Sequence, residues 1–100
     1  METEYLENLS ENEYKELSAF LERNGITPEG IPESAVLLRE EENIIASACL
    51  FGELIKYVAV DFEQRGSGLT AALITEIRKR AFRSGKEHLF LITKPENRTM

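Results

Sequence analysis

The chain has 100 residues, of which 42% are hydrophobic, and a formal net charge of −6. This length suits a single domain with one hydrophobic core, and this composition excludes an intrinsically disordered chain. No apolar run reaches the length of a membrane span, the acidic start lacks the basic and apolar segments of a secretory signal, and so acidic a chain is a poor partner for nucleic acid.

The charge is divided unevenly along the chain. Residues 1–42 contain 12 Glu and three basic residues, a net charge of −9, whereas residues 43–100 contain six acidic and nine basic residues, a net charge of +3. We interpret the acidity of the first part as a solvated helix face, with a docking surface for a basic partner as the alternative. The single cysteine, Cys49, cannot form an internal disulfide, which agrees with a reducing, cytoplasmic location.

A first helix is predicted to begin at a capping box. Ser10 and Glu13 have the S-x-x-E spacing of that motif, and the helix should end at Asn24-Gly25. Four apolar residues supply the stripe that would face the core: Tyr14, Leu17, Phe20 and Leu21. We expect residues 2–9 to be a frayed extension of this helix, since Tyr5, Leu6 and Leu9 also have helical spacing.

Three strands are predicted to follow an irregular connection at residues 26–33, which contains Pro28, Gly30 and Pro32. Their ranges are residues 34–39, 44–51 and 54–60, with a charged turn at residues 40–43. The pair Gly52-Glu53 fits a two-residue hairpin, so the second and third strands should be antiparallel neighbours.

A second helix and a fourth strand complete the predicted elements. Leu69, Leu73, Ile77 and Ala81 recur every four residues, which is typical of a helix packed on a sheet. Gly85 should follow the end of this helix, and residues 88–93 should form a strand parallel to residues 54–60. We interpret the basic run Arg78–Arg83 as a solvated helix face, with contact to a cofactor phosphate as the alternative.

The turn between the third strand and the second helix carries the strongest functional signal. It reads Arg65-Gly66-Ser67-Gly68, and its two glycines allow positive φ and a close approach of a ligand to the backbone. A helix that begins near Gly68 leaves its first N–H groups unpaired and carries partial positive charge there. The turn therefore predicts an anion site with Arg65 beside it.

A dinucleotide fingerprint is a formal alternative for the same turn. Gly66, Gly68 and Ala71 satisfy the pattern G-x-G-x-x-A. However, that motif follows the first strand of a parallel unit and requires an acid at the end of the next strand. Here the preceding strand belongs to a hairpin, and the nearest acid, Glu87, comes before the next strand. We therefore set this alternative aside.

The turn resembles the acyl-CoA-binding motif of the GNAT acyltransferase superfamily, Q/R-x-x-G-x-G/A. It stands here as Arg65-Gly66-Ser67-Gly68-Leu69-Thr70, and Thr70 occupies a position where Gly or Ala is usual. The resemblance implies an α/β, GNAT-like fold with a mixed, mostly antiparallel sheet and flanking helices. It also implies acetyl-CoA or a CoA-derived prosthetic group as the cofactor.

Within that superfamily, residues 14–97 are similar to the N-terminal, acetyltransferase-like domain of the citrate lyase ligase family. The most specific pieces are Ile55–Val60 (IKYVAV), Arg65–Leu69 (RGSGL) and His88–Leu91 (HLFL) followed by Thr93-Lys94. The resemblance implies an enzyme that acetylates the thiol of the lyase prosthetic group, with ATP used in a separate domain. Residues 1–100 would then be a single GNAT-like domain and a fragment of a longer chain, lacking the usual C-terminal helix and strand. The implied partners are a CoA-type small molecule and the acyl carrier subunit of citrate lyase.

The resemblance also assigns roles to individual residues. The pantetheine arm would lie along the third strand, and the pyrophosphate would lie on the N–H groups of the turn. The implied cofactor-binding residues are Val58, Ala59, Val60, Arg65, Gly66, Ser67, Gly68, Leu69, Thr70 and Asn97. Glu63, or Asp61, is a candidate general base at the end of the strand, with solvated loop acids as the alternative.

Two further residues and two further functions complete the hypotheses. Cys49 on an apolar strand is predicted to be a core residue, and His88 has no second histidine with which to form a metal site, so no metal is expected. The alternatives to a ligase domain are a free-standing acetyltransferase that moves acetyl to an amine and a non-catalytic interaction module.

Overall fold

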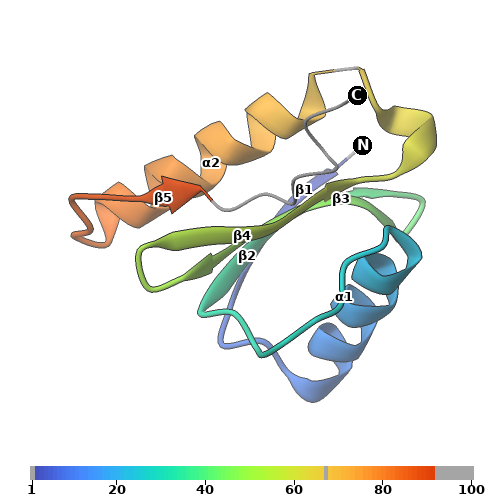
Figure 1. The fold of residues 1–100 in the computed structure, drawn as a ribbon, viewed down its shortest axis with the longest axis horizontal. Helices are drawn as coiled ribbons and strands as arrows, with labels where there is room; N and C mark the ends of the chain where they lie inside the picture. Colours follow the sequence, from blue (N-terminus) through green and yellow to red (C-terminus); the bar gives the residue numbers. More distant parts are fainter. Residues whose placement is uncertain (1, 67, 92–100) are drawn as a thin grey trace.

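The computed structural model describes residues 2–66 and 68–91, which form one five-stranded sheet with a helix on each face (Figure 1). The elements are β1 Glu2–Glu7, α1 Glu11–Arg23, β2 Ser34–Glu40, β3 Asn43–Phe51, β4 Leu54–Val60, the short 3₁₀ helix η1 Phe62–Gln64, α2 Leu69–Arg83 and β5 Phe90–Leu91. The strand order is β1-β2-β3-β4-β5. All neighbours are antiparallel except β4 and β5, which are parallel. The predicted mixed, mostly antiparallel α/β fold is confirmed.

The expectation of a helical extension before α1 was wrong. Residues 2–7 form β1, an edge strand in which Glu2 lies opposite Arg39 and Glu7 lies opposite Ser34. Leu6 packs in the cluster on the α1 face of the sheet, whereas Tyr5 packs against the cluster on the α2 face. This alternation is the two-residue period of a strand. The helical spacing of Tyr5 and Leu9 was outweighed by the hydrogen bonds that the free edge of β2 offers.

α1 forms as its capping box predicts. The Ser10 backbone N–H donates to the Glu13 carboxylate at 2.8 Å, and the Glu13 N–H donates to the Ser10 hydroxyl at 3.1 Å. These two bonds satisfy donors that a helix start would otherwise leave unpaired. The helix buries Leu17, Phe20 and Leu21 against the sheet.

α2 covers the opposite face of the sheet through the predicted stripe. Leu73, Ile77 and Ala81 are buried, and they pack with side chains of β2, β3 and β4: Val36, Leu38, Ile45, Ala46, Ala48, Leu50, Ile55 and Val60. β3 is therefore covered on both faces. Cys49 lies on this strand in the α1-side cluster, where burial raises the pKa of its thiol. Its side chain is fully buried, which confirms its prediction as a core residue. A buried thiol with a raised pKa is also a poor nucleophile.

One arginine joins three elements on the α1 side of the sheet. Arg39, on β2, donates from both terminal nitrogens to the two carboxylate oxygens of Glu16 on α1, at 2.7 and 2.9 Å. Its Nε donates to Glu4 on β1 at 2.7 Å. The hydrogen bonds from Arg39 lower the pKa of Glu16 below its ordinary value of 4.5. Two of the glutamates in the acidic first part are thus partners of a basic side chain.

We expect the Glu16→Gln variant to be less stable than the wild type at pH 7 by up to about 1 kcal/mol, the range of partly exposed ion pairs. Because the pKa of Glu16 is lower in the folded state, the ion pair stabilises the fold above pH 4.5 and this contribution is lost as the pH falls through the lowered pKa. Urea unfolding at pH 7, 5 and 3 measures the difference. The matched control is Glu7→Gln, which removes an exposed carboxylate that belongs to none of the ion pairs found in residues 2–66 and 68–91. A Glu16→Gln penalty of equal size at pH 3 and pH 7 would contradict this assignment.

Candidate functional site

A cavity of about 500 Å³ lies where the end of β4 meets the start of α2. We call it the glycine-turn cavity. Its lining residues are Val60, Gln64, Arg65, Gly66, Gly68, Leu69, Thr70, Ala71 and Ile74. Six of the predicted cofactor-binding residues are in this set. Ser67 and Asn97 lie outside the described residues, and Val58 and Ala59 precede the cavity on β4.

The two glycines of the turn have the conformation that the sequence predicts. Gly66 has φ +84° and Gly68 has φ +82°, a region that other residues rarely adopt. Gly68 is the N-cap of α2, and no side chain caps this end of the helix. The first turn of α2 contains no acidic residue. The N–H groups of this turn and their partial positive charge are therefore presented at the cavity.

The glycines are required by backbone conformation and not by crowding within the protein. A Cβ atom placed on Gly66 or on Gly68 would meet nothing within 4 Å. The space in front of both residues is thus open on the cavity side. This geometry allows a ligand to approach the backbone closely.

A β-bulge interrupts β4 just before the cavity. Ser47 pairs with Ala59, but Cys49 pairs with Lys56, so the single β3 residue between them faces two residues of β4. One of these two is Tyr57, whose φ is +55°. The Ser47 hydroxyl donates to the Tyr57 carbonyl at 2.7 Å in the interior and satisfies it there. Bulges bend a strand and redirect its edge.

The side chain of Tyr57 fixes the bulge to the connection after α1. Its hydroxyl accepts hydrogen bonds from the backbone N–H groups of Glu29 at 2.6 Å and Gly30 at 3.1 Å. The extra residue also reverses the facing of the strand. Ile55 packs on the α2 side, whereas Tyr57 packs on the α1 side, although they are two residues apart.

Beyond the bulge, alternate residues of β4 point their backbone N–H and C=O groups away from β3. The Asp61 N–H donates to the Ile45 carbonyl at 2.8 Å, and Val60 lies opposite Ala46. In an antiparallel pair this pattern directs the N–H and C=O of Val60 away from β3, and those of Val58 in the same direction. Among residues 2–66 and 68–91, β5 pairs with β4 only at Leu54 and Ile55. The outer edge at Val58 and Val60 is therefore the edge that an added extended chain would use.

Arg65 lies on the wall of the cavity and bonds to this edge. Its Nε donates to the Val60 carbonyl at 3.2 Å, and its guanidinium lies 5.6 Å from the centre of the Phe62 ring. A carbonyl oxygen accepts two hydrogen bonds and a guanidinium has five N–H donors. The predicted place of Arg65 beside the anion site is consistent with this geometry, and the side chain links the turn to β4.

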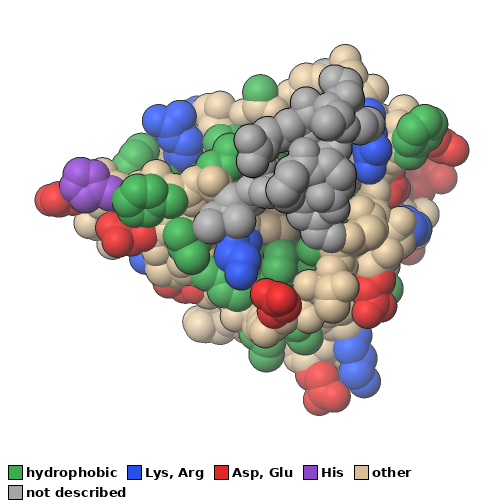
Figure 2. Space-filling view, viewed as in Figure 1, with side chains coloured by type: hydrophobic (Ala, Val, Ile, Leu, Met, Phe, Trp, Pro, Cys, Tyr) green, Lys and Arg blue, Asp and Glu red, His purple; other side chains and the backbone are tan. Residues whose placement is uncertain are grey.

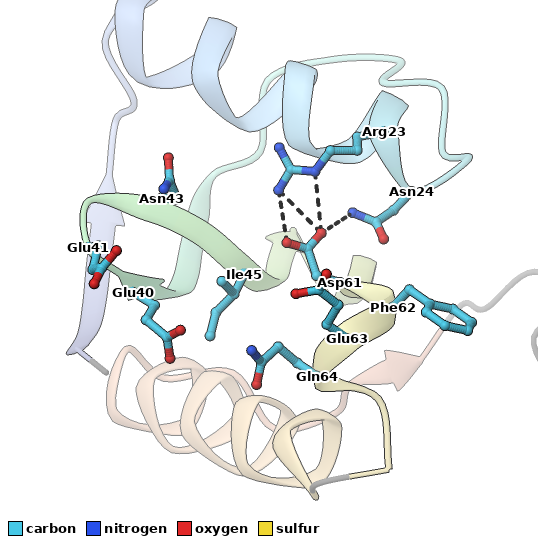
Figure 3. Close-up of a pocket in the computed structure, with 10 residues that line it drawn as sticks. All are labelled: Arg23, Asn24, Glu40, Glu41, Asn43, Ile45, Asp61, Phe62, Glu63 and Gln64. Atoms are coloured by element: carbon cyan, nitrogen blue, oxygen red, sulfur yellow. Dashed lines mark hydrogen bonds and ion pairs between the residues drawn. The ribbon is translucent and has the colours of Figure 1, made fainter.

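A second cavity of about 530 Å³ lies beside η1, at the end of the sheet where α1 ends (Figure 3). Its residues come from the end of α1, the β2–β3 turn and η1: Arg23, Asn24, Glu40, Glu41, Asn43, Ile45, Asp61, Phe62, Glu63 and Gln64. Gln64 also lines the glycine-turn cavity, so the two cavities adjoin at this residue.

The two candidate general bases differ in this second cavity. Asp61 accepts hydrogen bonds from Arg23 at 3.0 Å and from the Asn24 side chain at 3.0 Å, as Figure 3 shows. Arg23 also donates to the Ile44 carbonyl at 3.0 Å. Asp61 therefore fastens the end of α1 to the end of β4, and both of its carboxylate oxygens already accept hydrogen bonds. Glu63 is exposed and lines the cavity.

Comparison with known proteins matches nearly the whole chain to one protein family. Residues 2–100 match the acetyltransferase (GNAT) family. The chain belongs to this family.

The curated relatives of this GNAT domain are much longer proteins. The chain is 39% identical to a [citrate [pro-3S]-lyase] ligase of Haemophilus influenzae over 88% of its own length and 28% of that protein. It is 34% identical to the enzyme of the same name from Escherichia coli, over 81% of its own length and 23% of that protein. The chain thus spans about a quarter of these relatives.

Solved structures show the same fold. The GNAT domain superposes on the crystal structure of Escherichia coli ElaA with a TM-score of 0.77 and 13% identity, over 99% of this chain and 82% of that one. At this level of identity the likeness concerns the fold alone. The shared fold agrees with the mixed sheet and with the parallel strands β4 and β5, which α2 connects.

Sequence reasoning missed the role of Arg23 and Asn24 in this GNAT domain. Asn24 was predicted only as the end of the first helix, and no role was predicted for Arg23. They contact Asp61, which is 38 and 37 residues away in the chain. No local pattern indicates such a contact, because it depends on how α1 crosses the sheet.

Two further features are absent from the part of the chain that the structure describes. Residues 2–66 and 68–91 contain no group of three or more His, Cys, Asp or Glu side chains that could hold a metal ion. Among the same residues, neither helix is both long enough and apolar enough to span a bilayer.

Proposed function

We propose that this GNAT domain binds CoA or a CoA-derived prosthetic group in the glycine-turn cavity. The observation that carries the proposal is the pair Gly66 and Gly68, both at positive φ, which opens the uncapped start of α2 onto the cavity. The diphosphate would accept hydrogen bonds from the N–H groups of the turn and of the first residues of α2. Leu69 and Thr70 are the first two residues of that helix, and the Thr70 hydroxyl is a further donor.

Most of the affinity must come from the pantetheine arm. A helix terminus favours an anion by at most about 2 kcal/mol, whereas micromolar binding requires about 8 kcal/mol. The arm would add to the outer edge of β4 at Val58 and Val60, as an extra strand does. Arg65 would then share the Val60 carbonyl with the arm or turn toward the phosphates. Ala59 is buried in the cluster on the α1 side of the sheet, where it packs in the core. Asn97 is proposed to reach the arm from outside the described residues.

We further propose that the domain is the N-terminal module of a citrate lyase ligase. The relatives that it matches over most of its length carry that name, and it spans about a quarter of each. In this proposal the domain holds the CoA-like prosthetic group of the lyase acyl carrier subunit while its thiol is acetylated. ATP chemistry would belong to the remainder of the longer protein, and the reaction would take place in the cytoplasm.

A free-standing N-acetyltransferase is a second candidate, and one observation favours it. Glu63 lines the second cavity, which adjoins the glycine-turn cavity at Gln64. An amine that entered the second cavity would meet this carboxylate, which would act as its general base. The ligase function has the stronger support, because the relatives cover 88% and 81% of this chain.

Isothermal titration with CoA and with dephospho-CoA tests the cofactor proposal. We expect both to bind in the micromolar range with similar affinity, since the proposed contacts involve the diphosphate and the pantetheine arm. Binding of neither compound would overturn the proposal and leave a non-catalytic interaction module. A strong preference for CoA would show that the 3′-phosphate is also read, with Arg78–Arg83 as the candidates. Turnover of acetyl-CoA on a panel of amines would favour the free-standing acetyltransferase.

A further inference from the structure

The outer face of α2 is basic, although the protein as a whole is acidic. We define this face by the residues of the helix that are exposed from Ala71 onward: Ala71, Ala72, Thr75, Arg78, Lys79, Phe82 and Arg83. They occupy one side of a helical wheel, opposite the buried stripe that packs on the sheet. The face has three basic residues and no acidic one, in a chain of net charge −6. Figure 2 shows Lys and Arg side chains beside hydrophobic ones over this helix.

The positive charge of this face is not neutralised within the described residues. None of the ion pairs found in residues 2–66 and 68–91 includes Arg78, Lys79 or Arg83. The helix has a single acid, Glu76, which pairs with Arg80 at 3.0 Å on the flank of the face. The three exposed cations therefore remain available to an external partner.

The same face contains a partly exposed aromatic side chain. Phe82 is 45% exposed, and the Arg78 guanidinium lies 6.0 Å from the centre of its ring. Arginine and aromatic residues are enriched at protein interfaces and at their energetic hot spots. Basic residues beside an exposed phenylalanine on one helix face give this surface the composition of a protein-binding site.

The face begins at the glycine-turn cavity. Ala71 belongs both to the outer face and to the lining of the cavity. From there to Arg83 the helix rises by about 18 Å. A protein that rests on this face can therefore place a phosphate-linked, flexible prosthetic arm at the mouth of the cavity. A nucleic acid is a poor partner, because it needs a broad basic surface and the acidic residues 1–42 would repel its phosphates.

We propose that the outer face of α2 docks the acidic surface of the carrier protein that presents the prosthetic-group thiol to the glycine-turn cavity. This inference deepens the proposed function and rests on it. The charges would steer the carrier and set its orientation, and Phe82 would supply an apolar anchor. The docking would be transient, since one helix face buries less than a standard interface.

The test measures binding of the purified acyl carrier subunit of a citrate lyase, with and without its prosthetic group, by fluorescence anisotropy at low and high salt. We expect Lys79→Glu to weaken binding of the loaded subunit about fivefold, and Arg78→Glu/Lys79→Glu/Arg83→Glu to weaken it more than about tenfold. Binding should fall as salt rises. The matched control is Lys15→Glu, the same exposed charge reversal on α1, which should have no effect.

A parallel titration with CoA separates this inference from the proposed cofactor site. The triple variant should bind CoA with unchanged affinity, and circular dichroism should show an unchanged fold. If CoA binds but the carrier subunit does not, or if Lys15→Glu weakens the carrier as much as Lys79→Glu, the docking surface is wrong and the cofactor proposal stands. If the triple variant no longer binds CoA, the outer face of α2 binds a cofactor phosphate and not the carrier. Stronger binding to nucleic acid or to anionic vesicles than to the carrier would also overturn the inference.

Discussion

The Gly68→Ala variant is expected to bind CoA about tenfold to thirtyfold more weakly than the wild type. Gly68 caps α2 at φ +82°, where an alanine is strained by about 1–2 kcal/mol. Relief of that strain rotates the N–H groups that the proposed diphosphate site uses. The loss of a helix-terminus contact of about 2 kcal/mol corresponds to roughly thirtyfold in affinity. Isothermal titration with CoA measures the change.

A second glycine provides a matched control for this variant. Gly25 follows the end of α1 with φ +79°, nearly the same φ as Gly68, and does not line the glycine-turn cavity. A Cβ atom at either position meets nothing within 4 Å. Gly25→Ala should therefore destabilise the fold by a similar amount and leave CoA affinity unchanged. Equal loss of CoA binding in both variants would assign the effect to general destabilisation and remove the turn from the site.

The Phe20→Ala variant is expected to lower the free energy of unfolding by about 3–5 kcal/mol, the usual cost of removing a buried aromatic ring. Phe20 is 1% exposed and belongs to the cluster between α1 and the sheet. The Arg23 guanidinium also lies 5.2 Å from the centre of its ring. Since small domains are stable by only about 5–15 kcal/mol, the variant should be unfolded or nearly so at 37 °C. Thermal and urea unfolding followed by circular dichroism measure the loss.

Phe62→Ala is the control for this core substitution. It removes the same side chain from a position that is 79% exposed, so its effect on unfolding should stay within about 0.5 kcal/mol. A Phe20→Ala penalty no larger than that of Phe62→Ala would mean that α1 is not packed on the sheet as described. The contact between Arg23 and Asp61 would then also lose its support.

Local patterns were sufficient wherever a short stretch decides its own structure. The capping box of Ser10 and Glu13 identified the start of α1, because both partners lie within one turn. The hairpin at Gly52-Glu53 and the stripe of α2 were likewise readable, since each depends on residues a few positions apart. The described part of the predicted fourth strand is shorter than residues 88–93, with β5 at Phe90–Leu91. The prediction was wrong for His88 and Leu89, which precede the strand, and residues 92–93 lie outside the described residues.

Local patterns failed where a distant edge or face decides the outcome. β1 was predicted as helix because its apolar spacing is ambiguous, and only the unpaired edge of β2 selects a strand. The bulge at Tyr57 could not be foreseen either. It depends on the register between β3 and β4 and on a Ser47 hydroxyl placed ten residues earlier in the chain.

The sequence by itself determined the glycine turn of this protein, because two glycines at a helix start specify both a backbone conformation and a partial charge within a few residues. It also determined family membership and the order of helices and strands from α1 to α2. Only the tertiary structure decided how these parts become a site. It directs the edge of β4 outward through a bulge, bonds Asp61 to Arg23 so that Glu63 remains the exposed acid, and places a basic helix face beside the cavity. These features depend on contacts between residues far apart in the chain, which no local spacing encodes.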